Sequence, residues 1–315
     1  MDLTVAVVAG GASAEADVSR SSAREVTAAL KARFAAVEQL ELDDSLYDAL
    51  GKFEPDVVFP VLHGPPGEDG TVQGFLDIAG YPYVGSDVRG SAIAMDKYVA
   101  KLVFKQASIA VLDDVYVTRH DDVAASVRVI EARLGDRVVI KPTRQGSAIG
   151  VTLLPNGGDI SAPLREALRF GEGVLVEPYA LGKEITVGVL DLEGSEPSAF
   201  PVIEIKTATG EWYDFTNRYT PGKSEHVIPA PLPDELNVAL QAAAITGHRS
   251  LGLRDLSRAD FIVTDANEAF LLEINTLPGM TPTSLYPDGA RANGMSFEDL
   301  MQALVHSAHR RAGAQ

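Results

Sequence analysis

The sequence predicts a mixed fold in which a parallel α/β sheet is followed by α+β structure. Strand-like apolar runs alternate with helical patterns from residue 3 to residue 60, and this alternation is typical of a parallel sheet. From residue 137 the pattern changes to strand, turn and strand. The length of 315 residues allows about two to three domains of ordinary size.

Composition and charge narrow the classes of partner and chemistry. The formal net charge of −17 argues against nucleic acid or an anionic membrane surface as a partner. The absence of cysteine excludes thiol catalysis, disulfides and cysteine-based zinc sites. The first residues lack the cationic segment of a signal peptide, and no run approaches the ~20 apolar residues that a membrane span needs. We therefore expect a cytoplasmic enzyme.

The first domain is expected to bind a ligand at one edge of its sheet. Its predicted strands cover residues 3–9, 37–42 and 56–60, with helices that end near residue 33 and span residues 46–51. Glu15 follows the first strand, at the carboxyl edge where α/β proteins bind ligands. The turn before it lacks GxGxxG spacing, so a dinucleotide site is not expected. His63 begins a second loop at this edge and is interpreted as a pocket residue; a purely structural histidine is the alternative.

The middle of the chain shows features of a phosphate site. The first domain ends near residues 90–95, and Asp96 then opens a helix that carries Lys97. Predicted strands at 138–142 and 149–151 flank a loop with Gly and Ser, whose backbone N–H groups can fold over phosphates. Lys141 lies near the end of an apolar strand, where its ammonium needs a partner unless its stem lies along the surface.

A long polar segment is predicted to cover a site. It spans residues 206–227, has neither a helical nor a strand period, and contains four aromatic residues that disfavour disorder. The surrounding predicted elements are a helix at 163–170, strands at 173–177, 184–190 and 198–205, and helices at 234–251 and 296–311. Residues 177–181 could offer backbone groups to a planar base, and a plain strand exit is an equal alternative.

A hairpin from residue 258 to residue 275 is predicted to form a metal site. With residues 265–268 as its turn, Asp260 faces Glu273, Arg258 faces Asn275, and Phe261 faces Leu272. Side chains alternate between the faces of a strand, so the four polar residues share one face. Their oxygen atoms suit Mg²⁺. An ordinary solvated hairpin face is the alternative, and the Pro-Gly turn that follows, which can present backbone N–H groups, favours a site.

Seven segments in order resemble the D-alanine:D-alanine ligases of the ATP-grasp superfamily. They read GGASAEADVS, LHGPPGEDGTVQG, SAIAMDK, IKPTRQGSAIGV, YDFTNRY, SRADF and LLEINTLPGMTPTSL, and they span almost the whole chain. The resemblance implies a three-domain ATP-grasp architecture with ATP gripped between the second and third domains. It divides the chain into an N-terminal α/β domain at 1–95, a central lid domain at 96–180, and a C-terminal domain at 181–315 that carries the lid loop 206–227.

The resemblance assigns residues to ATP and metal. It implies that Lys97 and Lys141 contact the phosphates, and that Ser147, Arg218 and Asn275 also meet the nucleotide. Around adenine and ribose it places Glu177, Pro178, Ala180, Leu181 and Glu184. The implied ligands of two Mg²⁺ ions, with Mn²⁺ as an alternative, are Asp260, Glu273 and Asn275. This metal set agrees with the hairpin register.

The resemblance also assigns the substrate sites, with D-alanine as both substrates. Glu15 would hold the ammonium of the first D-alanine, with His63 nearby, while Ser147 and Tyr219 would tie the lid down through hydrogen bonds. Arg258 and the backbone N–H of Gly279 would form an oxyanion hole, and Ser284 would bind the carboxylate of the second D-alanine. The implied reaction passes through an acyl phosphate, and the implied assembly is a homodimer.

One position departs from the family pattern. The lid usually reads Tyr-x-x-x-x-Lys-Tyr, and Arg218 stands here at the lysine position and next to the second-substrate site. Arginine keeps the charge, but its planar fork places its donors differently. A ligase with D-serine, D-lactate or another amino acid as second substrate is therefore an alternative. A non-catalytic ATP-binding protein is disfavoured, because the carried-over site residues are present.

Overall fold

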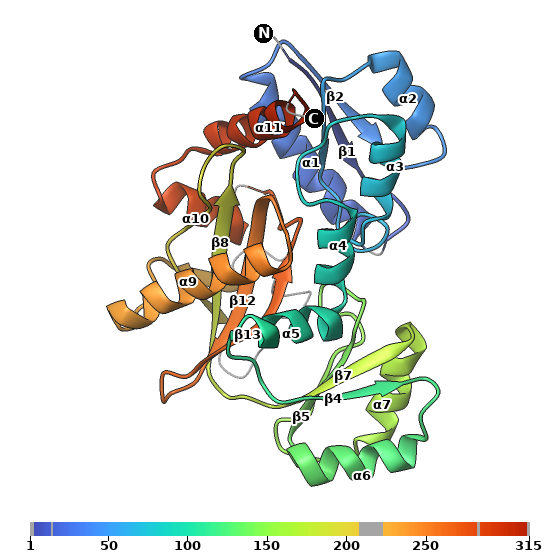
Figure 1. Ribbon diagram of the computed structural model, residues 1–315, viewed down its shortest axis with the longest axis vertical. Helices are drawn as coiled ribbons and strands as arrows, with labels where there is room; N and C mark the ends of the chain where they lie inside the picture. Colours follow the sequence, from blue (N-terminus) through green and yellow to red (C-terminus); the bar gives the residue numbers. More distant parts are fainter. Residues whose placement is uncertain (1–2, 14, 208–222, 282–283, 314–315) are drawn as a thin grey trace.

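The N-terminal part of the chain forms a parallel three-stranded sheet between two layers of helices (Figure 1). The computed structural model describes residues 3–13, 15–207, 223–281 and 284–313. The strand order is β2-β1-β3, with β1 at Thr4–Ala9, β2 at Ala36–Glu41 and β3 at Val57–Pro60. The helices are α1 at Ala16–Lys31, α2 at Leu46–Phe53 and α3 at Thr71–Ala79. The predicted parallel sheet is confirmed.

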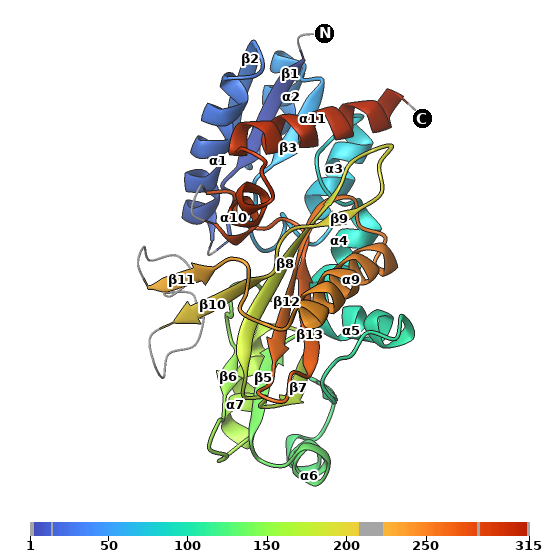
Figure 2. The same cartoon turned by 90° about the vertical axis from the view of Figure 1, so that its left-hand side faces the viewer.

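Side chains that alternate along β1 explain both layers. Val5 and Val7 are fully buried with α1 and the closing helix α11, Phe297–Gly313, whereas Ala6 and Val8 pack toward α2 and α3. Figure 2 shows α11 lying across this sheet, although it is the last helix of the chain. The first domain is therefore completed by residues far away in sequence.

Two helices connect the first sheet to the rest of the molecule. α4 spans Val88–Met95 and α5 spans Lys97–Gln106, with Asp96 between them. The Asp96 carboxylate caps α5 by accepting hydrogen bonds from the N–H groups of Tyr98 and Val99, both at 3.2 Å. The predicted helix start at Asp96 is thus confirmed. α5 fixes Lys97 at its first position.

The central part forms an antiparallel sheet in the order β4-β7-β5-β6. Its strands are β4 at Val115–Thr118, β5 at Val138–Pro142, β6 at Thr152–Leu153 and β7 at Gly173–Pro178. Its helices are α6 at Val123–Leu134 and α7 at Ser161–Ala167, and a 3-10 turn at Leu168–Phe170 follows. The strand predicted at 149–151 is wrong. Positive φ angles at Ser147, Ala148 and Gly150 turn the backbone there, so pairing begins only at Thr152.

The C-terminal part is built on a larger antiparallel sheet in the order β11-β10-β8-β12-β13, with β9 paired to β8. The bounds are β8 Lys183–Asp191, β9 Ser198–Ala199, β10 Ile203–Thr207, β11 Ser224–Val227, β12 Asp255–Val263 and β13 Ala269–Asn275. Its helices are α9 at Asp234–Ser250 and α10 at Leu285–Ala292. The single strand predicted at 198–205 is two strands. Pro201 lacks a backbone N–H and interrupts the ladder between them.

The apolar cores do not follow the predicted domain limits. Ala100 and Phe104 of α5 pack in one cluster with Val187 of β8 and Leu240 of α9. A separate cluster joins β4, β5 and β7 to α6 and α7. The limits at residues 95 and 180 remain predictions. None of the described helices combines the length and apolar character that crossing a bilayer requires.

Candidate active site

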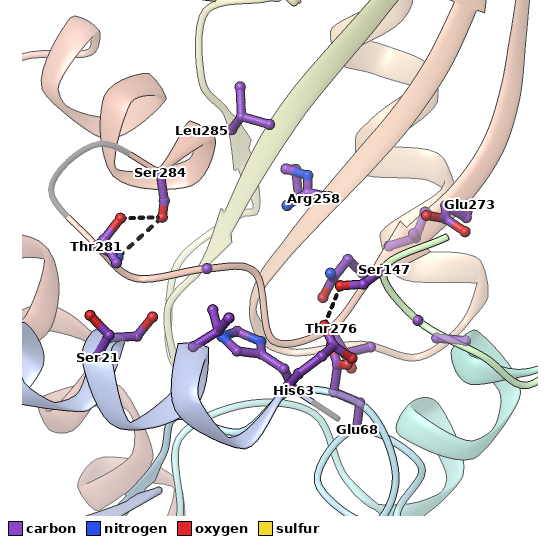
Figure 3. Close-up of a pocket in the computed structure, with 18 of the residues that line it drawn as sticks. Ser21, His63, Glu68, Ser147, Arg258, Glu273, Thr276, Thr281, Ser284 and Leu285 are labelled. Atoms are coloured by element: carbon purple, nitrogen blue, oxygen red, sulfur yellow. Dashed lines mark hydrogen bonds between the residues drawn. The ribbon is translucent and has the colours of Figure 1, made fainter. Parts of the chain in front are cut away.

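Two neighbouring cavities lie where the three sheets approach one another. The larger has a volume of ≈ 930 Å³ and is lined by residues from α1, the β3–α3 loop, the β5–β6 loop, β12 and the segment after β13 (Figure 3). The smaller, ≈ 210 Å³, lies between β7, β8 and β12. Lys97, Ser147 and Glu273 line both cavities. A ligand that spans them would therefore contact all three parts of the chain.

The hairpin of β12 and β13 presents its polar residues as predicted. Arg258 pairs with Asn275, and Asp260 pairs with Glu273. The predicted pairing of Phe261 with Leu272 is wrong, because a β-bulge after Asp260 brings Leu271 opposite Phe261. Leu271 is consequently the core residue, with 1% exposure, while Leu272 lines the smaller cavity. The bulge leaves the polar pairs in register, since it lies beyond them.

Each hairpin carboxylate has a cationic partner. Arg258 donates two hydrogen bonds to Asp260, Nε to Oδ1 at 2.8 Å and Nη2 to Oδ2 at 2.7 Å. Lys97 Nζ lies 3.2 Å from Glu273 Oε2, and it also donates to the Gln145 carbonyl at 2.7 Å. These pairs compensate two acids that face each other across the ladder.

The hairpin residues fit a divalent metal by their chemistry. Asp260, Glu273 and Asn275 supply carboxylate and carboxamide oxygens from adjacent strands, which are the ligands that Mg²⁺ prefers. The Asn275 Oδ1 atom accepts the Leu277 N–H at 2.9 Å, and a carbonyl oxygen has a second lone pair to offer. Among the residues with described positions, no three His, Asp or Glu form a metal-sized group. The metal-ligand roles therefore remain a prediction.

A buried lysine–glutamate cluster supports the floor of the smaller cavity. Glu177 is 1% exposed, and its two carboxylate oxygens contact Lys101 Nζ and Lys141 Nζ, each at 2.5 Å. Burial alone would raise the pKa of Glu177, but the two ammonium groups outweigh burial and hold this pKa below its ordinary value. The expected partner of Lys141 is thus present. Lys101, on the buried face of α5, gave no recognisable signal in the sequence.

The residues expected around the base and ribose line the smaller cavity. Its lining includes Glu177, Pro178, Ala180, Leu181 and Glu184. Apolar walls come from Val139, Leu153 and Phe261 on three different strands. Such a slot, with apolar walls and backbone groups at its rim, suits a planar ring. The contacts of these residues with ATP remain a prediction.

Glu15 and Ser147 join the first domain to the β5–β6 loop. The Ser147 hydroxyl donates a hydrogen bond to Glu15 Oε1, and Glu15 is only 4% exposed. Gly64 allows this arrangement, since a Cβ atom at that position would lie 2.9 Å from Glu15 Oε2 and its φ is +66°. The geometry brings two predicted site residues together from segments 132 positions apart.

Two further buried groups line the same cavity as Glu15. Burial and the nearby Arg258 guanidinium lower the pKa of His63 to about 4, and within the described residues its Nε2 atom has no hydrogen-bond partner. Burial and the neighbouring Glu15 carboxylate raise the pKa of Glu68 to about 8. Glu68 Oε2 accepts the Gly64 N–H at 2.5 Å. Glu68 was not predicted, although it is an acid in the same Gly-rich loop as His63 and could have been found on that ground.

Arg258, Gly279 and Ser284 also line the larger cavity. Ser284 precedes α10, and its Oγ accepts the Thr281 N–H at 3.1 Å. A Cβ atom at Gly279 would lie 3.0 Å from this Oγ, so the two residues are neighbours. Figure 3 shows Arg258 between Ser284 and Glu273. Arg218 and Tyr219 lie outside the described residues.

Comparison with known proteins gives one family. The family model of the D-ala D-ala ligase N-terminus matches residues 38–86, and that of the C-terminus matches residues 103–306. A D-alanine–D-alanine ligase of Desulforudis audaxviator is 43% identical over 308 residues, which cover 98% of this chain and 99% of the relative. A D-alanine–D-alanine ligase of Halalkalibacterium halodurans is 41% identical over 305 residues, which cover 96% of this chain and 98% of the relative.

Solved structures agree with the sequence relatives. The D-alanine–D-alanine ligase of Bacillus anthracis in complex with ATP has a TM-score of 0.84 at 28% identity and covers 99% of both chains. The VanG D-Ala:D-Ser ligase of Enterococcus faecalis has a TM-score of 0.83 at 30% identity, covering 98% of this chain and 100% of its own. The family models, the sequence relatives and the solved structures agree over almost the whole chain. The chain therefore belongs to the D-alanine–D-alanine ligase family, which has the ATP-grasp fold.

Proposed function

We propose that this protein is an ATP- and Mg²⁺-dependent ligase that joins two D-alanines to form D-alanyl-D-alanine for peptidoglycan. The observation that carries the proposal is one cavity that holds Glu15, Arg258, Ser284 and the hairpin acid Glu273 together. Carboxylate activation by ATP and amide formation need these groups within reach of one substrate pair. Relatives of similar length with this enzyme name, and one solved in complex with ATP, support it.

The smaller cavity would hold the nucleotide. Its apolar walls would take the base, and Lys97 and Lys141 would neutralise phosphate oxygens at the border with the larger cavity. Asp260, Glu273 and Asn275 would hold Mg²⁺. When bound, the metal supplies positive charge that lets a carboxylate approach the polyphosphate.

The larger cavity would hold both amino acids. Glu15 would bind the ammonium of the first D-alanine, whose carboxylate attacks the γ-phosphorus and displaces ADP to give an acyl phosphate. The deprotonated amine of the second D-alanine then attacks the acyl carbon, a C–N bond forms, the C–O bond to phosphate breaks, and inorganic phosphate leaves. Arg258 and the Gly279 N–H would stabilise the tetrahedral oxyanion. His63, uncharged at neutral pH, would lie beside the first substrate without adding a cation.

The test is a coupled assay of phosphate release from ATP, with the product identified by mass. We expect release that requires both D-alanine and Mg²⁺, with one dipeptide formed per ADP. ATP turnover that is the same with and without D-alanine, or turnover only with other acids, would contradict the proposal. The matched variant Arg258→Lys keeps the charge but loses the two-point contact with Asp260, and we expect kcat to fall by about 100-fold.

A different second substrate is the competing proposal, because Arg218 replaces the usual lysine and the VanG relative is named a D-Ala:D-Ser ligase. A panel of D-alanine, D-serine, D-lactate and L-amino acids as acceptors, run on wild type and Arg218→Lys, separates the two. Preference of the wild type for D-alanine would leave the first proposal standing. We further propose that the protein is cytoplasmic and that it forms a homodimer. Light scattering of the purified protein would test the homodimer by its mass.

A further inference from the structure

A histidine–aspartate pair lies on the wall of the larger cavity, beyond the groups used above. His226 is on β11 and Asp288 is on α10, and the His226 Nδ1 atom lies 2.7 Å from Asp288 Oδ2. Both side chains are 16% exposed. This contact is therefore less screened by water and salt than an ordinary surface pair.

A second hydrogen bond helps to keep the Asp288 carboxylate ionised. Its second oxygen, Oδ1, accepts a hydrogen bond from Arg291 Nη1 at 2.5 Å. Burial alone would raise the pKa of Asp288, but the hydrogen bonds from His226 and Arg291 outweigh burial and lower it. Asp288 is thus ionised at neutral pH, so that His226 Nδ1–H donates to a charged acceptor.

Asp288 is connected to the acceptor end of the cavity through one helical turn. Its backbone N–H donates to the Ser284 carbonyl at 3.0 Å. The Ser284 hydroxyl in turn bonds to Thr281, at 3.1 Å to its N–H and 2.7 Å to its Oγ1, and it lies next to Gly279. A displacement of Asp288 is consequently passed to Ser284 and its neighbours.

His226 connects the same turn to the large sheet. In the ladder it pairs with Ile205 of β10, so the two side chains share one face of the sheet. Ile205 packs with Ile203 of β10 and with Leu285, the first residue of α10. The start of α10 is therefore held on the sheet by an apolar contact from Leu285 and by a charged hydrogen bond to Asp288.

We propose that the His226–Asp288 pair positions Ser284 and thereby sets the affinity for the second amino acid. The inference rests on the proposed function, which gives Ser284 the carboxylate of that substrate. Ser284 precedes the N-terminus of an eight-residue helix, where a carboxylate is favoured, and the pair fixes this end against the sheet. His226 and Asp288 act through Ser284, so they are positioning residues.

The test measures the KM for the second D-alanine at saturating ATP. We expect His226→Ala and Asp288→Asn each to raise this KM by about tenfold, the usual effect of one lost charge-assisted hydrogen bond. Because the reacting atoms are untouched, kcat and the KM for ATP should stay within about twofold. His226→Asn should restore most of the affinity, since its amide N–H can replace Nδ1–H. The double variant should be no weaker than either single one.

The control variant is His120→Ala, which removes an exposed histidine from the turn after β4 and should change no kinetic constant. If wild type forms no dipeptide, the proposed function fails. If wild type forms dipeptide, three results for His226→Ala and Asp288→Asn would overturn the positioning role. These are an unchanged KM for the second D-alanine, a loss of kcat alone, and a parallel rise in the KM for ATP. Where His226→Ala does not fold, as judged by its thermal midpoint, Asp288→Asn decides the question because asparagine has nearly the same size and shape as aspartate.

Discussion

Two side chains in the cavity that Glu15 lines are uncharged at neutral pH although both belong to ionisable types. The pKa of His63 is about 4 and that of Glu68 is about 8, and burial is the main cause of both shifts. The proposed first substrate, which brings its own ammonium and carboxylate, would therefore meet no charge from these two side chains. The His63 Nε2 atom, which has no hydrogen-bond partner within the described residues, would be available to orient it.

Glu68 predicts a pH-dependent stability. Because its pKa is raised from 4.5 to about 8 by folding, the folded state binds more protons in this window, and stability falls as pH rises through it. Glu68→Gln has no carboxyl group to titrate and so removes this pH dependence. As the pH rises from 6 to 9, the unfolding free energy of wild type should fall relative to that of the variant by on the order of 2 kcal/mol. Thermal unfolding midpoints at both pH values measure it. The control Glu131→Gln changes an exposed residue, so its stability relative to wild type should not change with pH. An equal change with pH in this control would refute the raised pKa of Glu68.

Glu177 predicts a large penalty for removing one buried charge. Glu177→Gln leaves the ammonium groups of Lys101 and Lys141 close together without their shared carboxylate. We expect a loss of about 3 kcal/mol in unfolding free energy and weaker ATP binding. Glu172→Gln breaks the exposed pair with Arg119, at 2.7 Å, and should cost less than about 1 kcal/mol. Calorimetry and nucleotide titration compare the two, and equal effects would contradict the claim.

At the scale of elements, the sequence predicted what depends on local pattern and failed where packing decides. The hairpin pairs Arg258–Asn275 and Asp260–Glu273 followed from the turn position and the period of two. The bulge at Leu272 did not, because it depends on which leucine the neighbouring core accepts. The need of Lys141 for a partner was predictable, but its partner Glu177 lies 36 residues away on another strand.

The β5–β6 loop predicts a backbone effect on nucleotide binding. Gly150 has a φ of +72°, and a Cβ atom there would lie 2.7 Å from the Phe170 ring and 2.8 Å from Pro142. Gly150→Ala should therefore displace the loop that carries Ser147 and raise the KM for ATP by about tenfold, with roughly 1–3 kcal/mol lost in stability. Gly51→Ala, in α2 with open space around it, should instead stabilise the protein by about 0.5–1 kcal/mol. An unchanged KM in Gly150→Ala would show that the loop tolerates the strain.

At the scale of the whole molecule, a buried network ties the last helix, α11, to β12. Asp255, the first residue of β12, is fully buried and accepts hydrogen bonds from Ser307 Oγ at 2.7 Å, from Arg311 Nη1 and Nη2, both at 2.8 Å, and from the Gly85 N–H at 2.8 Å. These contacts join three segments that are distant in sequence. Local pattern could not reveal them, and for the same reason the predicted limits at residues 95 and 180 divide cores that pack as units.

This network predicts a large global effect from one substitution. Arg311→Ala leaves the Asp255 carboxylate buried without its cation, and we expect a loss of about 3–5 kcal/mol in unfolding free energy. Arg33→Ala removes a pair with Asp299, at 2.5 Å, that also joins the first domain to α11 but is largely exposed, so it should cost less than about 1 kcal/mol. The thermal unfolding midpoints of the two variants measure this difference. Similar midpoints would argue against the Asp255 network as the main contact that holds α11 in place.

The position of α11 has a consequence for the growing polypeptide. Its residues Leu300 and Leu304 cover the face of β1 that carries Val5 and Val7, yet almost three hundred residues separate the two in the chain. During synthesis α1 can cover part of this face early, but the part that α11 covers stays open to water until the end of the chain has emerged. A fragment that ends before Phe297 should therefore bind chaperones or aggregate through this face, even though it contains every strand that the structure describes.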